Sequence, residues 1–147
     1  MNATVVCGLG NDLRGDDAAG LLVARALLKL DVQGVDVEEH SGEPDSLVAA
    51  MSQHRHVIIV DAVAGDAPPG TVLSRFWNGA AMRGAVSSHG LSVGEALGLA
   101  RVLGANADVA VYGIVGRVFE IGSPPSVEVV RAAAELAVRI EEDLSCA

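Results

Sequence analysis

The sequence predicts a three-layer α/β/α domain, in which a parallel sheet lies between two layers of helices. Segments with strand character and segments with helical spacing alternate along almost the whole chain of 147 residues, which is typical of this class. Half of the residues are apolar but only 3% are aromatic, so Ala, Val, Leu and Ile must build the core. Such side chains suit parallel strands that are covered on both faces. We expect residues 1–147 to form one domain, because a chain of this length can bury roughly 68–70% of its unfolded surface.

Five short segments are expected to form the strands. Residues 57–60 are apolar at every position, which is typical of a central strand. Residues 35–38 alternate between apolar and acidic side chains, as a half-exposed strand does. The segment after the Pro-Pro-Gly turn is expected at an edge of the sheet, and residues 78–88, rich in small residues, are expected to be loop. The expected strands are residues 4–7, 35–38, 57–60, 71–76 and 109–115.

Four helices are expected between these strands. The first begins at about Asp16, and its apolar residues recur on one face as far as residue 30. The second begins near Pro44, because proline suits the first helical position. The third begins at the capping box Ser92-Val93-Gly94-Glu95 and is stopped by Gly104. The last follows the Ser-Pro-Pro-Ser segment 123–126, and its apolar face continues towards the end of the chain.

Composition excludes several classes of partner and location. A net charge of −9 argues against nucleic acid, which requires a basic patch. No apolar run approaches the ~20 residues that span a bilayer, and the first residues lack the pattern of a secretory signal. Cys7 and Cys146 lie at opposite ends of the chain, so neither a disulfide framework nor a paired metal spacing is expected. These features favour a cytoplasmic protein, for which we take a monomer as the expected state.

The most informative segment joins the first strand to the first helix. Gly8 and Gly10 form a glycine turn, in which they are expected to let the backbone bend, and Asp16 and Asp17 then open the helix. Such a turn resembles a phosphate-binding loop, but two carboxylates at a helix N-terminus would repel a phosphate. The pair is better suited to a metal cation.

Dinucleotide binding is the rival interpretation of this segment. Gly8 and Gly10 follow a strand, and Glu38 or Glu39 ends the second strand where a ribose-binding acid would lie. The third glycine of the fingerprint is missing, however, because Leu13 occupies its position. A lone Gly-x-Gly is a weak signal, so this interpretation is the weaker one.

Three residues are candidates for a metal site at one edge of the sheet. Asp17 opens the first helix, Asp61 follows the central apolar strand, and His89 lies just before the third helix. Because the carboxyl ends of parallel strands meet at one edge, these side chains can converge there. Two carboxylates and one imidazole suit nickel, zinc, iron or manganese. His40, after the second strand, is the reserve ligand.

Each of these residues also has a simpler interpretation. Asp16 and Asp17 can be acids that stabilise the first turn of a helix, Asp61 can be a turn residue, and His89 can contact loop backbone. Cys7 lies in an apolar strand and is expected to be an inert core thiol. The remaining histidines lie at a strand entry on the opposite edge and are expected to be solvated; they are His54 and His56.

The motifs resemble those of the [NiFe]-hydrogenase maturation proteases. Residues 8–20, GLGNDLRGDDAAG, look like the opening motif of that family. Val60-Asp61-Ala62 looks like its strand-end aspartate, and Ser88-His89-Gly90-Leu91 resembles its histidine segment before a helix. Pro69-Gly70-Thr71 is also similar. The resemblance covers most of the chain and preserves the order of the motifs.

The resemblance implies a fold, a function and a metal. The fold is a twisted, mostly parallel five-stranded sheet between helices, of the phosphorylase/hydrolase-like type. The function is that of an endopeptidase that removes the C-terminal extension of the hydrogenase large-subunit precursor after nickel insertion. The resemblance implies that Asp17, Asp61 and His89 bind this nickel, which arrives in the substrate, and that the peptidase thereby tests whether the precursor is loaded. Asp16 is a candidate for orienting the site from behind.

One segment departs from the family pattern. The family commonly has an aspartate-glycine pair after the second strand, whereas residues 39–43 here read Glu-His-Ser-Gly-Glu. Glu43 or His40 is then a candidate for the missing aspartate's role. A different function also remains open, that of a nickel-checking or assembly protein that uses the same three ligands without cutting.

Overall fold

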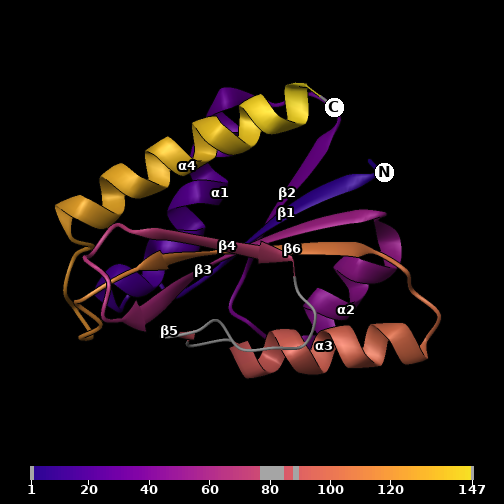
Figure 1. The fold of residues 1–147 in the computed structure, drawn as a ribbon, viewed down its shortest axis with the longest axis horizontal. Coiled ribbons are helices and arrows are strands. Elements are labelled where there is room, and N and C mark those ends of the chain that lie inside the picture. The colour runs from indigo at the N-terminus through magenta and orange to yellow at the C-terminus, as the bar shows by residue number, and fades with distance from the viewer. Residues whose placement is uncertain (1, 77–84, 88–89, 147) are drawn as a thin grey trace.

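The computed structural model describes residues 2–76, 85–87 and 90–146, and it places helices on both sides of one sheet (Figure 1). The strands are β1 (Thr4–Leu9), β2 (Val35–His40), β3 (His56–Gly65), β4 (Val72–Phe76), β5 (Ala85–Ser87) and β6 (Asp108–Val115). The helices are η1, a 3-10 turn (Gly15–Ala18), α1 (Ala19–Leu30), α2 (Pro44–Gln53), α3 (Gly90–Val102) and α4 (Val127–Ser145). This order confirms the predicted alternation of strands and helices.

The sheet is mostly parallel, as predicted. Its strand order is β2-β1-β3-β6-β4, and β1, β2, β3 and β6 pair in parallel. β4 lies at one edge and is antiparallel to β6, which confirms residues 71–76 as an edge segment. The short β5 pairs antiparallel with the end of β3, outside this path of five strands.

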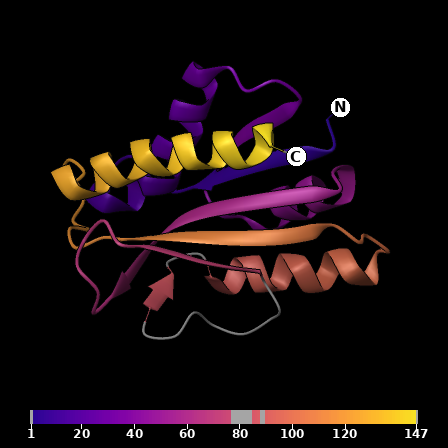
Figure 2. The same cartoon turned by 45° about the horizontal axis from the view of Figure 1, so that its top comes forward.

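Two helices cover each face of the sheet, which confirms the three layers (Figure 2). The face that carries Cys7 and Ile59 packs against α2 and α3, through residues such as Leu47 and Ala96. The opposite face packs against α1 and α4. Because successive side chains of a strand point to opposite faces, the apolar run in β3 supplies both cores at once. Aliphatic residues fill both clusters, as composition predicted.

The central strand is longer than predicted, and this changes the place of Asp61. β3 runs from His56 to Gly65, so Asp61 lies inside the strand rather than at its end. The pairing with β1 ends at Val60, whereas the pairing with β6 continues to Val63. Asp61 therefore directly follows Val60, the last residue of β3 that pairs with β1. The apolar run marks only the part of the strand with neighbours on both sides.

Two further boundaries differ from the predictions. Residues 78–88 were expected to be loop, but Ala85–Ser87 form β5, and the rest of this segment lies outside the described residues. α3 begins at Gly90, two residues before the predicted capping box at Ser92. A three-residue strand depends on its pairing with β3, and local composition does not encode that pairing.

His54 is buried, so the prediction that it is solvated is wrong. Its Nδ1–H donates to the carbonyl of Ala50, and its Nε2 lies 2.8 Å from a carboxylate oxygen of Asp36. These contacts join the end of α2 to the edge strand β2. The side chain of His56 is 48% exposed, which confirms the prediction for that residue.

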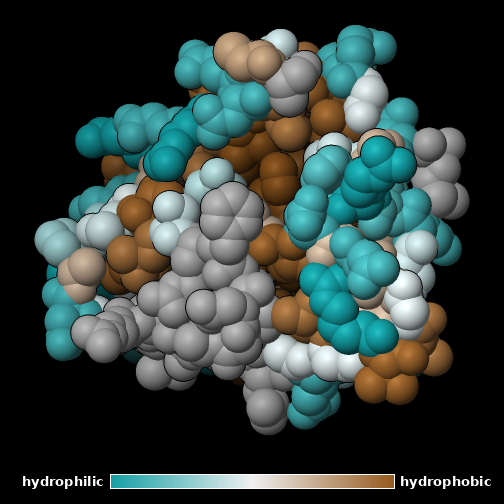
Figure 3. All heavy atoms as spheres, turned by 45° about the vertical axis from the view of Figure 1, so that its right-hand side comes forward, coloured by the Kyte–Doolittle hydropathy of each residue, from teal (hydrophilic) through white to brown (hydrophobic). Residues whose placement is uncertain are grey.

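The surface carries both polar and apolar side chains. In Figure 3, hydrophilic residues surround smaller hydrophobic areas, and several large apolar side chains are exposed, among them Leu13, Val102 and Ile121. Single exposed apolar residues of this kind are ordinary. Among the described residues, no helix has both the length and the apolar character needed to span a membrane.

Candidate functional site

The glycines of the opening motif allow one close packing contact between α1 and the sheet. A Cβ on Gly8 would lie 2.2 Å from the carbonyl oxygen of Gly20, and a Cβ on Gly20 would lie 2.3 Å from the carbonyl oxygen of Val60. A Cβ on Gly10 would meet the carbonyl oxygen of Asp17 at 2.3 Å. Side chains at these positions would push the helix away from the sheet.

These contacts correct the predicted role of the two glycines. The φ angles of Gly8 and Gly10 are not positive, whereas the φ angle of Gly15 is 52°. Gly15 therefore makes the unusual bend, and Gly8 and Gly10 allow the main chains to approach.

Asp17 and Asp61 are both buried at the same end of the sheet. Asp17 is 1% exposed in η1, and Asp61 is 2% exposed in β3. Oδ1 of Asp61 accepts a hydrogen bond from the main-chain N–H of Ala62 at 2.8 Å. Nη1 of Arg14 lies 4.0 Å from Oδ2 of Asp17. The close contact between Gly20 and Val60 brings their two segments together.

His89, the third predicted ligand, lies outside the described residues. It directly precedes Gly90, where α3 begins. The structure therefore brings Asp17 and Asp61 to the same end of the parallel strands. The third predicted residue, His89, is not among the described residues. Whether these residues bind metal stays a prediction.

Asp16 connects the opening motif to a segment more than 100 positions later. Oδ2 accepts hydrogen bonds from the main-chain N–H groups of Arg117 and Val118 at 2.8 and 3.0 Å. Oδ1 accepts from both the main-chain N–H and the hydroxyl of Ser126 at 2.6 and 2.9 Å. Because Ser126 is the N-cap residue of α4, this carboxylate fixes the start of that helix.

The pKa of Asp16 reflects this role. Burial alone would raise it, but the hydrogen bonds from Arg117, Val118 and Ser126 outweigh burial, and the pKa of the carboxyl is lowered. A charged carboxylate is therefore part of the folded structure. Asp16 is an acid in the first turn of η1, as its simpler interpretation has it, but its carboxylate also holds the segment that leads into α4. Its partners were not visible in the sequence, because nothing local marks residues 117–126 as donors.

An open cleft of about 540 Å³ lies beside Asp17. Residues from the opening motif form one wall, and residues from the end of β2 form the other. The lining residues are Gly10, Asn11, Asp12, Arg14, Asp17, Leu21, Glu39, His40 and Ser41. The cleft thus joins a predicted ligand, Asp17, to the segment 39–43 that departs from the family pattern.

Arg25 links the two walls of this cleft. Its guanidinium donates to both carboxylate oxygens of Asp12 at 2.8 Å and to Glu39 at 2.8 and 3.3 Å. Hydrogen bonding to Arg25 lowers the pKa of Asp12. Glu39, one candidate for a ribose-binding acid, is therefore engaged by an arginine. Sequence reasoning missed Arg25, because its partners lie 13 and 14 positions away.

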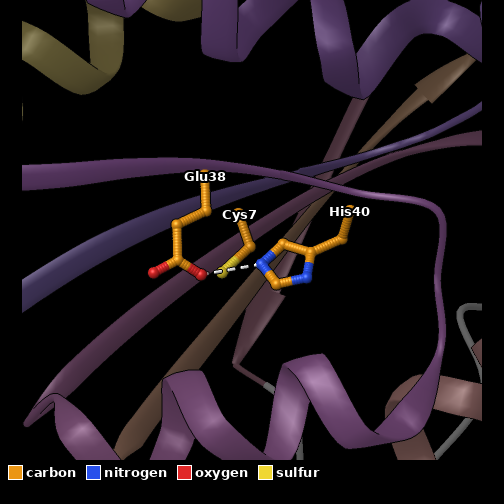
Figure 4. Close-up of side chains that lie close together, drawn as sticks. All are labelled: Cys7, Glu38 and His40. Atoms are coloured by element: carbon orange, nitrogen blue, oxygen red, sulfur yellow. Dashed lines mark hydrogen bonds and ion pairs between the residues drawn. The ribbon is translucent and has the colours of Figure 1, made fainter.

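His40, the reserve ligand, lies beside Glu38 and Cys7 (Figure 4). Its Nε2 lies 2.8 Å from Oε1 of Glu38. Its main-chain carbonyl accepts a hydrogen bond from the N–H of Gly10 at 3.0 Å. Burial, and secondly the charge of Glu38, raise the pKa of the Cys7 thiol to about 12. Cys7 is fully buried in the core, which confirms the predicted place of this thiol.

A family model and solved structures point to the same protein family. The model of the hydrogenase maturation protease family matches residues 28–143, a range that includes Asp61 and His89 and begins after Asp17. No curated protein matches the chain.

Solved structures extend the similarity over the opening motif. The [NiFe] hydrogenase maturation protease HybD from Thermococcus kodakarensis is 28% identical, over 98% of this chain and 99% of that chain, with a TM-score of 0.81. The maturation protease HycI from Thermococcus kodakarensis KOD1 is 28% identical, over 98% and 93%, with a TM-score of 0.82. The endopeptidase HybD from E. coli is 21% identical, over 97% and 93%, with a TM-score of 0.78, and this likeness supports the fold alone.

Proposed function

The chain belongs to the hydrogenase maturation protease family, and from this premise we propose that it removes the C-terminal extension of a [NiFe]-hydrogenase large-subunit precursor after nickel insertion. At the coarser level its function is that of a peptidase in hydrogenase maturation. The observation that carries the finer proposal is the pair of buried carboxylates, Asp17 and Asp61, at one end of the parallel strands, where Asp17 also lines an open cleft.

The proposed ligands suit the nickel of the precursor. Asp17 and Asp61 supply oxygen, and His89, if it completes the set, supplies nitrogen. Such a set leaves coordination positions for groups of the precursor. Nickel is thus part of the substrate, and the three ligands let the peptidase test whether the precursor is loaded.

The chemistry is hydrolysis of one peptide bond. A bound cation polarises a carbonyl or lowers the pKa of a water molecule to roughly 7. The chain's own residues position the substrate. The close contact of Gly20 with β3 holds Asp17 against the sheet, and Asp16 fixes the loop before α4. We propose that the cleft beside Asp17 receives the segment of the precursor around the scissile bond.

The wall formed by residues 39–41 is the proposed site of recognition. It replaces the aspartate-glycine pair that is common in the family, and it presents Glu39, His40 and Ser41 to the cleft. The net charge of −9 favours a precursor segment with basic residues.

Mass spectrometry of the nickel-loaded precursor tests the proposal. The wild-type protein is expected to remove a C-terminal peptide, whereas Asp17→Asn, Asp61→Asn and His89→Ala are each expected to abolish the loss of mass. Asp108→Asn is the matched control, because its side chain is 74% exposed at the amino end of β6. Circular dichroism shows whether each variant is folded.

Two results would contradict the proposal. A folded Asp17 or Asp61 variant that processes the precursor at the wild-type rate would exclude the site. A wild-type protein that binds the loaded precursor without changing its mass would instead indicate a nickel-checking protein.

A further inference from the structure

Three potential metal ligands of different chemistry lie together between the sheet and α2. Cys7 lies on β1, and Glu38 and His40 lie on the neighbouring edge strand β2. Figure 4 shows the three side chains on the same side of the strands, directed towards one another. One ligand atom of each lies within 4.8 Å of the others. Pairing explains the arrangement, because Cys7 is opposite Glu38 in the parallel register and His40 is two residues further along the same face.

The spacing is close to that of a zinc site. Bonds of about 2.3 Å to sulfur and about 2.0–2.1 Å to nitrogen or oxygen place tetrahedral ligand atoms roughly 3.3–3.6 Å apart. Nε2 of His40 and Oε1 of Glu38 are 2.8 Å apart, and the widest separation in the group is within 4.8 Å. Side-chain shifts on the order of 1 Å therefore produce the coordination distances.

The surroundings favour a closed, weakly hydrated site with access at one side. Cys7 is fully buried, and it belongs to the core cluster with Leu47 and Met51 of α2. The side chain of His40 is 7% exposed and that of Glu38 is 38% exposed. A cation can therefore reach the group past Glu38 at the edge strand.

We propose that Cys7, Glu38 and His40 form a second metal site, which binds one divalent cation of the zinc class through sulfur, oxygen and nitrogen and leaves a fourth position for water. As the metal–sulfur bond forms, the thiol proton leaves to solvent. Because the Glu38 carboxylate accepts the hydrogen bond from His40, Nε2 carries a proton in the absence of metal. As the cation binds, Nε2 releases this proton to solvent and the neutral ring carries its proton on Nδ1, so that Nε2 and the carboxylate both bind the same cation. Thiolate, imidazole and carboxylate together favour zinc over magnesium or calcium.

This site differs from the one proposed for nickel and adjoins it. The nickel ligands provide only oxygen and nitrogen, whereas Cys7 provides sulfur. The carbonyl of His40 accepts a hydrogen bond from Gly10, and His40 lines the same cleft as Asp17. A cation here would join β1 to β2 directly beneath the opening motif.

The thiol of Cys7 has to lose its proton when it binds a cation. Burial and the charge of Glu38 hold the Cys7 thiol protonated in the absence of metal. A bound divalent cation reverses the second effect and favours the thiolate, because a coordinating thiol is deprotonated.

Titration of the metal-stripped full chain with Co²⁺ tests the inference without any peptidase assay. We expect one sulfur-to-cobalt charge-transfer band in the near ultraviolet, which saturates at one Co²⁺ per chain and disappears when Zn²⁺ is added. Cys7→Ser is expected to lose this band, and Cys146→Ser, which changes the exposed cysteine, is expected to keep it. Asp61→Asn is also expected to keep it, because oxygen and nitrogen ligands give no sulfur band.

His40→Gln and Glu38→Gln test the site from the edge strand in case Cys7→Ser does not fold. Each is expected to lose the band or to require at least tenfold more Co²⁺ for half-saturation. The inference is overturned if the wild type shows no sulfur band, or if the band depends on Cys146. It is also overturned if both edge-strand variants bind Co²⁺ as the wild type does.

Discussion

Asp16 and Asp17 are neighbours in the chain, yet their carboxylates have different surroundings. Asp17 faces the cleft, whereas Asp16 accepts four hydrogen bonds from the segment that leads into α4. The opening motif, residues 8–20, was sufficient to select Asp17 as a candidate ligand. The role of Asp16 could not be predicted, because its partners lie 101 to 110 positions later and two of the donor residues contribute only main-chain N–H groups.

Asp16→Asn is expected to lower the free energy of unfolding by about 2–4 kcal/mol. The amide keeps one acceptor oxygen, but its NH₂ group faces N–H donors that are then left without an acceptor, and buried donors in that state are costly. Urea denaturation measures the difference. Asp108→Asn, at an exposed position, should change stability by no more than about 0.5 kcal/mol. Equal effects for both variants would contradict the structural role of Asp16.

Acid should remove the contribution of Asp16. Its folded-state pKa is lowered, and the usual value in an unfolded chain is about 3.9. The unfolded state then binds more protons, so this contribution is fully present above about pH 4 and is lost as the pH falls through the folded-state pKa. The stability difference between the wild type and Asp16→Asn should therefore shrink on acidification from neutral pH. A difference that stays constant or grows would contradict this.

At the scale of elements, the position of α1 against β1 and β3 determines where Asp17 lies. Three glycines permit the contact, and a Cβ on Gly20 would lie 2.3 Å from two main-chain carbonyl oxygens. Apolar runs and helical spacing were enough to predict the strands in the sheet path and the four helices. They could not predict the end of β3 or the existence of β5, because both depend on pairing between distant segments.

Gly20→Ala is expected to destabilise the protein by at least about 2 kcal/mol and to reduce processing of the precursor. Alanine favours a helix by about 1 kcal/mol over glycine, but the added methyl group meets main-chain atoms that cannot yield without moving the helix. Thermal unfolding and the precursor assay measure the two effects.

Gly98→Ala is the matched control for this prediction. Gly98 also lies inside a helix, but a Cβ there meets nothing within 4 Å. This variant should therefore be stabilised by up to about 1 kcal/mol. If Gly20→Ala were as stable as Gly98→Ala, the close contact of α1 with the sheet would be excluded.

At the scale of the whole molecule, the fold brings residues from both ends of the chain to one edge of the sheet. The opening motif, the end of β2, the middle of β3 and the loop before α4 meet there. Alternation of strands and helices was sufficient to predict that these segments meet at the carboxyl ends of the parallel strands. The width of the cleft and the connection through Arg25 required the structure, because they depend on which side chains meet across it.

We propose that this protein cuts the precursor only when nickel is present, and that cleavage requires the buried carboxylates of Asp17 and Asp61. The most direct measurement is the intact mass of the large-subunit precursor after incubation with the wild type or Asp61→Asn, each with nickel-loaded and nickel-free precursor. We expect loss of a C-terminal peptide only for the wild type with the nickel-loaded precursor. Equal cleavage of the nickel-free precursor, or cleavage by a folded Asp61→Asn variant at the wild-type rate, would contradict it.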